Sequence, residues 1–254
     1  MIYLLLGAVC AFFGMSTGLG ATTLLRPVLD AVSPLAPQSA AAVAAMATLC
    51  AALVGAFFAL SQPLALPQEE LLFIAAGAAL GGILGDLGAS RFFTMVTPAA
   101  ASLLQNALLF TLIALPSIYF GTLAHSLSPL ILPRIYTFPA ALAAGLAASF
   151  LSFGAEPLTL MLCFVLLDME NDESHLCALT VALFSMAGKL VTLLIRSRFI
   201  LPSADVLIWL LPGMIIGALL AVTLGSRHAS ARSADALLKL SLFTSLLNMA
   251  AAWL

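Results

Sequence analysis

Residues 14–23 read Gly-Met-Ser-Thr-Gly-Leu-Gly-Ala-Thr-Thr and are followed by Pro27, and residues 149–157 read Ser-Phe-Leu-Ser-Phe-Gly-Ala-Glu-Pro. Both stretches interrupt long apolar segments with glycine and proline, the residues that least favour a continuous helix. Gly20 and Gly154 lie 134 positions apart, one in each half of the chain. Unwound backbone at bilayer depth is costly unless it lines a cavity, where its free N–H and C=O groups can bind a solute. The two stretches therefore predict a pair of broken membrane helices and favour a transporter.

The composition is that of an integral membrane protein. Of the 254 residues, 63% are hydrophobic and only 8% are charged, which is too few to cover a soluble globule of this size. Apolar runs of about 20 residues, the length that crosses a hydrocarbon core about 30 Å thick, predict eight spans. We place them at 2–32, 39–60, 70–89, 98–120, 137–167, 174–195, 205–224 and 234–254. The first and fifth are overlong, as expected of bent or broken segments.

The similarity between the two halves extends beyond the breaks. Residues 81–91 form a Gly-rich run that closes the third span, and residues 217–227 form a similar run at the end of the seventh. We therefore expect an all-α fold of two four-helix repeats, 1–125 and 134–254, each beginning with a broken helix. Four full crossings per half would give both halves the same orientation, whereas a segment that only dips into the bilayer would invert one half relative to the other. The sequence leaves both arrangements open.

Three charged residues lie close to the predicted breaks. An ionisable group at bilayer depth is costly and marks either a solute pathway or a buried pair. Glu156 lies in the second break, and Lys189 lies in the sixth span at a depth that differs by roughly 6 Å if both segments are upright helices. The two could form a neutralising ion pair, or Glu156 could carry a proton while its pairing to Lys189 changes as an anion enters. Arg26 offers a planar fork of donors suited to oxyanions, although it could instead extend to the interface.

The breaks predict two half-sites that face each other at mid-membrane, where helix N-termini present N–H groups to an oxyanion. Pro27 and Pro157 keep the broken helices from closing up, and Glu156 is the expected proton-coupling residue. The expected substrate-binding residues are Thr17, Gly18, Gly20, Thr22, Thr23, Arg26, Ser152, Gly154, Thr180 and Lys189. Each hydroxyl among them has an alternative role, a hydrogen bond to its own helix backbone.

Other polar features have simpler interpretations. Asp86 lies near a span end, about one turn from Arg91, so both are expected to reach the interface. The acidic connection 168–175 could bind a cation, but it lacks the ligand order of a calcium loop and a solvated turn is favoured. No cluster has metal-ligand spacing and no GxxxxGK[ST] motif is present, so we expect no metal, no cofactor and no nucleotide-driven coupling.

An enzyme is a rival interpretation. Residues 14–18, Gly-Met-Ser-Thr-Gly, formally fit the GxSxG nucleophile pattern, which requires a strand, a sharp turn and a helix. Here the pattern lies in a membrane span, and the three histidines, His125, His175 and His228, are placed in connections. We therefore expect no enzymatic activity.

Two further small-residue patterns complete a likeness to a known family. The second span carries Ala-Met-Ala-Thr at 45–48, and the sixth carries Cys-Ala-Leu-Thr at 177–180. Together with the broken helices and the Gly-rich runs, these patterns resemble the TauE/SafE family of sulfite and organosulfonate permeases over essentially the whole chain. The resemblance implies two four-span halves in the prokaryotic inner membrane and alternating-access transport of sulfite or an organosulfonate such as sulfoacetate. Glu156 stands where the family usually has glycine, so it could couple transport to protons or repel the usual anion.

Other functions stay open at this point. The chain could carry another small anion, or a cation with Glu156 as a ligand. A non-transporting membrane scaffold would also account for the Gly-rich packing faces and the short loops. We expect a small anionic solute and membrane lipid as partners and no nucleic acid, and the apolar exterior is compatible with a homo-oligomer.

Overall fold

The structure is all-helical. The computed structural model describes residues 1–33, 35, 37–61, 65–123, 130–196, 204–224 and 231–253, and no strand occurs in these ranges. The helices are α1 (Ile2–Ser16), α2 (Thr22–Val32), α3 (Pro37–Leu60), α4 (Gln68–Met95), α5 (Pro98–Ile118), α6 (Thr137–Leu151), α7 (Glu156–Leu167), α8 (Asn171–Ile195), α9 (Ala204–Leu224) and α10 (Ala231–Trp253). A π-helical turn (Tyr119–Leu123) extends α5, and a 3₁₀ turn (Arg134–Tyr136) precedes α6.

Several of these helices have the character of membrane spans. Within the described ranges, six segments are long and apolar enough to cross a bilayer: Ser39–Leu60, Gln68–Met95, Leu103–Gly121, Arg134–Leu151, Asn171–Ile195 and Ala204–Leu224. The predicted all-α class and multi-pass character are therefore confirmed. The arrangement of eight spans in two repeats stays a prediction.

The overlong first and fifth spans are each built from two helices. Between α1 and α2, Gly18 and Gly20 adopt φ angles of 73° and 80°, which a glycine tolerates without steric cost. Between α6 and α7, Ser152 and Ala155 adopt φ angles of 53° and 52°. Left-handed residues stop the i→i−4 hydrogen-bond ladder, so each helix ends where the sequence predicts a break.

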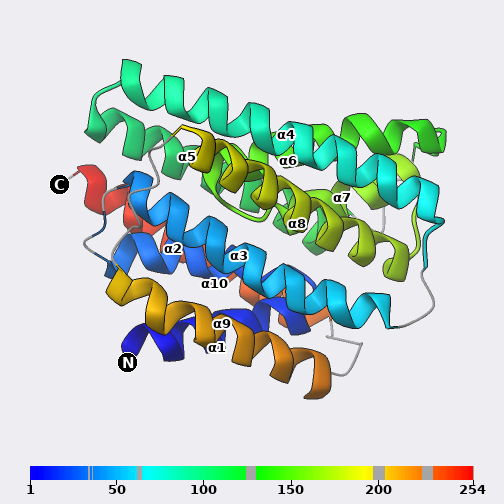
Figure 1. Cartoon of the computed structure of the whole chain (residues 1–254), viewed down its shortest axis with the longest axis horizontal. Coiled ribbons are helices and arrows are strands. Elements are labelled where there is room, and N and C mark those ends of the chain that lie inside the picture. The colour runs from blue at the N-terminus through cyan, green and yellow to red at the C-terminus, as the bar shows by residue number, and fades with distance from the viewer. Residues whose placement is uncertain are drawn as a thin grey trace.

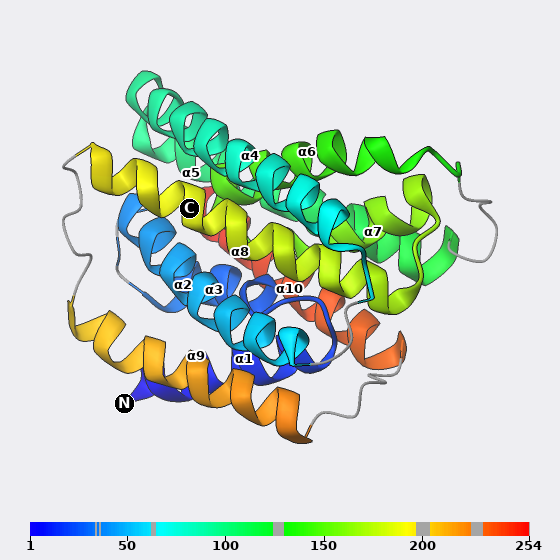
Figure 2. The ribbon, with the colours of Figure 1, turned by 45° about the vertical axis from the view of Figure 1, so that its right-hand side comes forward.

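The chain reverses direction at both breaks. The α1–α2 pair and the α6–α7 pair form helical hairpins that enter the bundle from opposite ends (Figures 1 and 2). Leu130, which precedes α6, donates its N–H to the carbonyl of Val165 at the far end of α7, 2.8 Å away. Arg134 Nη1 lies 2.9 Å from Oε2 of Glu70 in the first turn of α4, and Arg134 Nη2 lies 3.6 Å from Oε1 of Glu173 in the first turn of α8. The α6–α7 hairpin therefore begins and ends at the same end of the molecule as the starts of α4 and α8.

Small residues let each hairpin lie close to a long helix. The α6 helix packs along α4 and the α1 helix packs along α9, each pair running parallel. A Cβ on Gly81 would lie 2.3 Å from the Leu142 carbonyl oxygen, and one on Gly217 would lie 2.2 Å from the Ala8 carbonyl oxygen. The Gly-rich runs thus serve close helix packing, although residues 225–227 of the second run lie outside the described residues.

We predict that Gly81→Ala destabilises the protein while Gly88→Ala does not. The added methyl at Gly81 must push α4 and α6 apart, at a cost of about 1–3 kcal/mol. The same methyl at Gly88, on the same helix, meets only a Phe150 ring carbon at 3.9 Å. Thermal unfolding in detergent measures both, and equal melting temperatures for the two variants would contradict the close packing of α4 on α6.

Candidate functional site

The tips of the two hairpins meet inside the protein. The backbone N–H of Gly154 donates a hydrogen bond to Thr22 Oγ1 at 2.9 Å, joining residues from opposite halves of the chain. Thr22 and Ser152 are fully buried. The fold therefore brings both predicted half-sites together in its interior, as the transporter interpretation requires.

The Glu156 side chain lies between the two breaks. Glu156 is the first residue of α7 and is only 6% exposed. A Cβ on Gly20 would lie 2.1 Å from its carboxyl carbon, and one on Gly154 would lie 2.0 Å from its Oε2. Oε2 has no hydrogen-bond partner, and no cation of the described residues forms an ion pair with this carboxyl group. Glycines from both hairpins thus leave the space that this carboxyl group fills.

Lys189 is paired with Asp86 and not with Glu156. Its Nζ lies 3.3 Å from Asp86 Oδ1 and donates a 2.6 Å hydrogen bond to the Ser149 carbonyl in the last turn of α6. Thr192 Oγ1 donates to Asp86 Oδ2 at 2.6 Å. The Ser149 carbonyl also accepts the Ser152 N–H at 3.3 Å, and the cation lies at the C-terminal end of α6, where the helix dipole favours positive charge.

The expectation that Asp86 reaches the interface is wrong. Asp86 is only 4% exposed, because α4 continues to Met95 and so buries Asp86 between its neighbours. The predicted end of this span near residue 89 placed Asp86 too close to the surface. Arg91 itself is exposed, as expected.

Arg26 is buried in the first hairpin, so it does not extend to the interface. It is 1% exposed, and its Nε lies 3.0 Å from Asp30 Oδ2 one turn further along α2. Its Nη1 is buried and has no hydrogen-bond partner. Sequence reasoning missed Asp30, although the i,i+4 spacing of opposite charges on a helix was a signal for this pair.

Two side chains of α10 bond carbonyl groups around Pro27, and the proline leaves one of these carbonyls without a helical partner. Proline has no N–H, so the carbonyl of Thr23, four residues earlier, lacks its helical partner. Ser241 Oγ donates to this carbonyl at 2.5 Å, and Asn248 Nδ2 donates to the Pro27 carbonyl at 2.8 Å. Side chains from the other half of the chain thus stabilise the first hairpin.

The predicted hydroxyl ligands differ in their freedom to bind a solute. Thr17, Thr23 and Thr180 each donate to the carbonyl four residues earlier in the chain, at 2.8, 2.5 and 2.7 Å. Ser149 and Ser152 are buried, and their hydroxyl oxygens have no partner. A buried hydroxyl without a partner is expected where water or a ligand completes its hydrogen bonds. Ser152 is therefore the predicted ligand whose hydroxyl is free, and Ser149 is one that sequence reasoning missed.

His175 contacts the first break, contrary to its expected place in a connection. It belongs to the first turns of α8, and a Cβ on Gly18 would lie 2.0 Å from its Cε1 atom. The imidazole ring therefore packs directly against Gly18. His125 and His228 lie outside the described residues.

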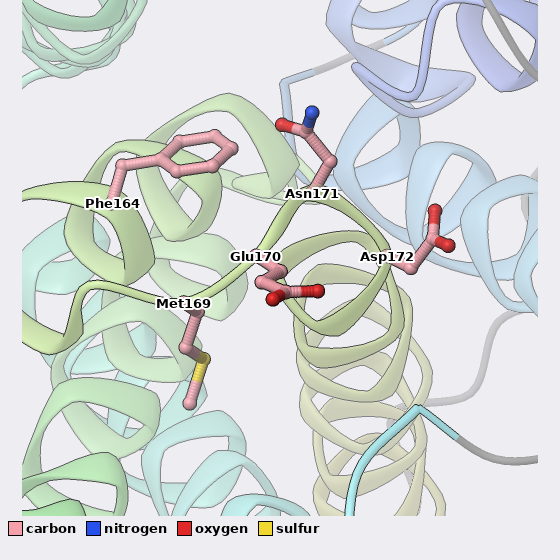
Figure 3. A pocket seen from close by; sticks show the side chains of 5 residues that line it. All are labelled: Phe164, Met169, Glu170, Asn171 and Asp172. Carbon is pink, nitrogen blue, oxygen red and sulfur yellow. The ribbon is translucent and has the colours of Figure 1, made fainter.

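The acidic part of the connection, residues 168–173, borders a surface hollow. A hollow of about 540 Å³ is lined by Phe164, Met169, Glu170, Asn171 and Asp172 (Figure 3). Glu170 begins α8 with a capping box, in which its N–H donates to Glu173 Oε2 at 3.2 Å. The Glu170 and Asp172 carboxylates do not converge in Figure 3. These contacts fit a solvated turn that starts a helix.

Comparison with known proteins identifies the family. A family model described as "Sulfite exporter TauE/SafE" matches residues 3–252, which include both hairpins and all the residues discussed above. No curated protein and no solved structure matched the chain. Because the family model covers nearly the whole sequence, this multi-pass membrane protein belongs to the TauE/SafE family of sulfite exporters.

Proposed function

We propose that this protein is a secondary transporter that moves a small sulfur oxyanion, sulfite or an organosulfonate such as sulfoacetate, across the prokaryotic inner membrane by alternating access. The observation that carries this proposal is the contact between two unwound segments in the interior, the Gly154 N–H bonded to Thr22. Unwound backbone at such a place is typical of solute sites in transporters. The sulfur chemistry comes from the family to which the chain belongs.

We infer that residues 1–125 and 134–254 are two repeats of inverted orientation. Each repeat would consist of a hairpin that dips into the membrane, followed by three crossings: α3 to α5 in the first and α8 to α10 in the second. The opposite directions of the two hairpins support this relation, as do the matching parallel pairs α1 with α9 and α6 with α4. Inverted repeats provide two related conformations, open to either side of the membrane.

The polar groups near the breaks suit an oxyanion. The helices α2 and α7 both begin at the breaks, so their N-terminal N–H groups and positive dipole ends lie beside the meeting point. Arg26 Nη1 and the hydroxyl groups of Ser149 and Ser152 are buried donors without partners. We propose that Arg26 and Ser152 bind the anion directly and that Lys189 acts through the end of α6, whose Ser149 carbonyl it holds.

The balance of buried charges supports proton coupling through Glu156. Arg26 is offset by Asp30, and Lys189 is offset by Asp86, so Glu156 is the carboxyl group near the breaks that no described cation offsets. A second negative charge beside it, brought by the anion, would be strongly unfavourable in a low-dielectric interior. A proton on Glu156 removes that repulsion. We therefore propose that the anion and a proton move together.

The direct test measures the melting temperature of the detergent-purified protein in the presence of one solute at a time: sulfite, sulfoacetate, taurine, thiosulfate, sulfate or acetate. We expect one sulfur oxyanion to raise the melting temperature, because a ligand bound only by the folded state stabilises it by mass action. Arg26→Ala should abolish the shift, while the control Arg91→Ala, at the exposed end of α4, should retain it. No shift with any anion would contradict the proposed function and favour a cation carrier or a scaffold.

A charge-pair test separates a structural Lys189 from a direct ligand. Lys189→Met leaves Asp86 buried without its cation, and we expect a loss of about 3–5 kcal/mol of stability. The double variant Asp86→Leu/Lys189→Met removes both charges, so it should recover most of this loss and keep the sulfite-dependent shift. If the double variant folds but no longer responds to sulfite, Lys189 contacts the anion itself.

Replacement of the proposed proton carrier should separate exchange from coupled transport. In proteoliposomes, Glu156→Gln should no longer accumulate the anion in response to a pH gradient, because the amide cannot bind and release a proton. Exchange of labelled for unlabelled anion across the same membrane should continue, since it needs no net proton movement. Accumulation by Glu156→Gln at the wild-type level would exclude Glu156 as the coupling group.

A further inference from the structure

The place that Glu156 occupies has the properties of an anion site. Its carboxyl group lies between Gly20 of the first break and Gly154 of the second, at positions where any side chain would overlap it. All three carboxyl atoms would lie within 2.6 Å of a Cβ on either glycine. Backbone from both hairpins thus lies directly against this carboxyl group.

The first break presents a helix start to this space. The helix α2 has 11 residues and begins at Thr22, two positions after Gly20. The first turn of a helix has N–H groups without intrahelical partners and carries a partial positive charge, so it attracts anions. The Glu156 carboxyl group lies beside this helix start and approaches it from the opposite hairpin.

The carboxyl group itself is incompletely bound. Only 6% of the Glu156 surface is exposed, yet its Oε2 has no hydrogen-bond partner. The half-buried Asp30 carboxylate accepts from Arg26, and the buried Asp86 carboxylate accepts from Thr192. A buried acceptor with no partner is costly, so this contact is poorly suited to a purely structural role.

We propose that the Glu156 carboxyl group occupies the oxyanion position of the transport site and that the transported anion takes its place. This inference rests on the proposed function and deepens it, because it identifies where the anion binds. A carboxylate carries its negative charge on two oxygen atoms bonded to one carbon, and a sulfite or sulfonate group carries it on three oxygen atoms bonded to one sulfur, so both present anionic oxygens from a single centre. The protein then carries a tethered stand-in for its substrate, and the anion binds only when the Glu156 side chain leaves the space between Gly20 and Gly154.

The experiment uses formate as a small free carboxylate. Glu156→Ala empties the space, and we expect formate to raise the melting temperature of this variant, with a dissociation constant about tenfold lower than for the wild-type protein. Glu156→Gln keeps a side chain of the same shape in this space but removes its charge, so formate should raise its melting temperature less than that of Glu156→Ala. Thr159→Ala, one turn along α7, is the matched control, because it removes a buried side-chain group without emptying the space and should not respond to formate.

Two results would overturn the proposal. One is a folded Glu156→Ala variant without a formate response, and the other is a formate response of the wild-type protein and Thr159→Ala that is as large as that of Glu156→Ala. If Glu156→Ala does not fold, the sulfite affinity of Glu156→Gln decides: we expect a dissociation constant about tenfold below that of the wild-type protein, since a neutral amide competes less strongly than a carboxylate for an anion site. An unchanged or weaker affinity would contradict the proposal. A wild-type protein that responds to sulfite while the formate test fails would leave the transport function standing and remove only this inference.

Discussion

The need to satisfy unwound backbone away from water governs this structure. Wherever a helix is broken at bilayer depth, its free N–H and C=O groups require partners from elsewhere in the protein. Side chains of distant elements bond four backbone groups in or near the two hairpin breaks: Thr22 bonds Gly154 N–H, Lys189 bonds Ser149 C=O, Ser241 bonds Thr23 C=O, and Asn248 bonds Pro27 C=O. These bonds tie each hairpin to the other or to a long helix. The breaks are therefore held open by the whole bundle and not by their local sequence alone.

Helix length explains why the breaks lie inside the protein. The helices α1 and α6 have 15 residues each. At a rise of about 1.5 Å per residue, each is about 22 Å long, which is shorter than the roughly 30 Å of a hydrocarbon core. The α1 helix therefore turns before it could cross, whereas the 3₁₀ turn Arg134–Tyr136 lengthens α6 to the 18-residue segment Arg134–Leu151, which is close to the crossing length. The close approach of α1 to α9 and of α6 to α4, at glycine positions, gives these short helices the packing surface that they need.

Local features of the fold could be predicted from the sequence, whereas its long-range pairings could not. Glycine and proline act through their own backbone, so the two breaks and most helix ends follow from residue type. The sequence did not decide whether the chain turns back at each break, because this depends on how the hairpins pack. The contact of Asp86 with Lys189 depends on the parallel packing of α4 against α8, which local sequence patterns do not predict. Asp30 is the exception, since its i,i+4 relation to Arg26 is visible in the sequence.

The two ion pairs near the breaks would respond differently from the Glu156 carboxyl group to a motion of the hairpins. The Arg26–Asp30 pair lies within one helix, and the Asp86–Lys189 pair joins α4, α8 and the end of α6, so each can move as a unit. The Glu156 carboxyl group is enclosed by glycines from both hairpins. A shift of one hairpin against the other would therefore leave the paired charges intact and change the surroundings of Glu156. In the transport mechanism that we propose, burial and charge at this carboxyl group connect solute binding with the conformation of the protein.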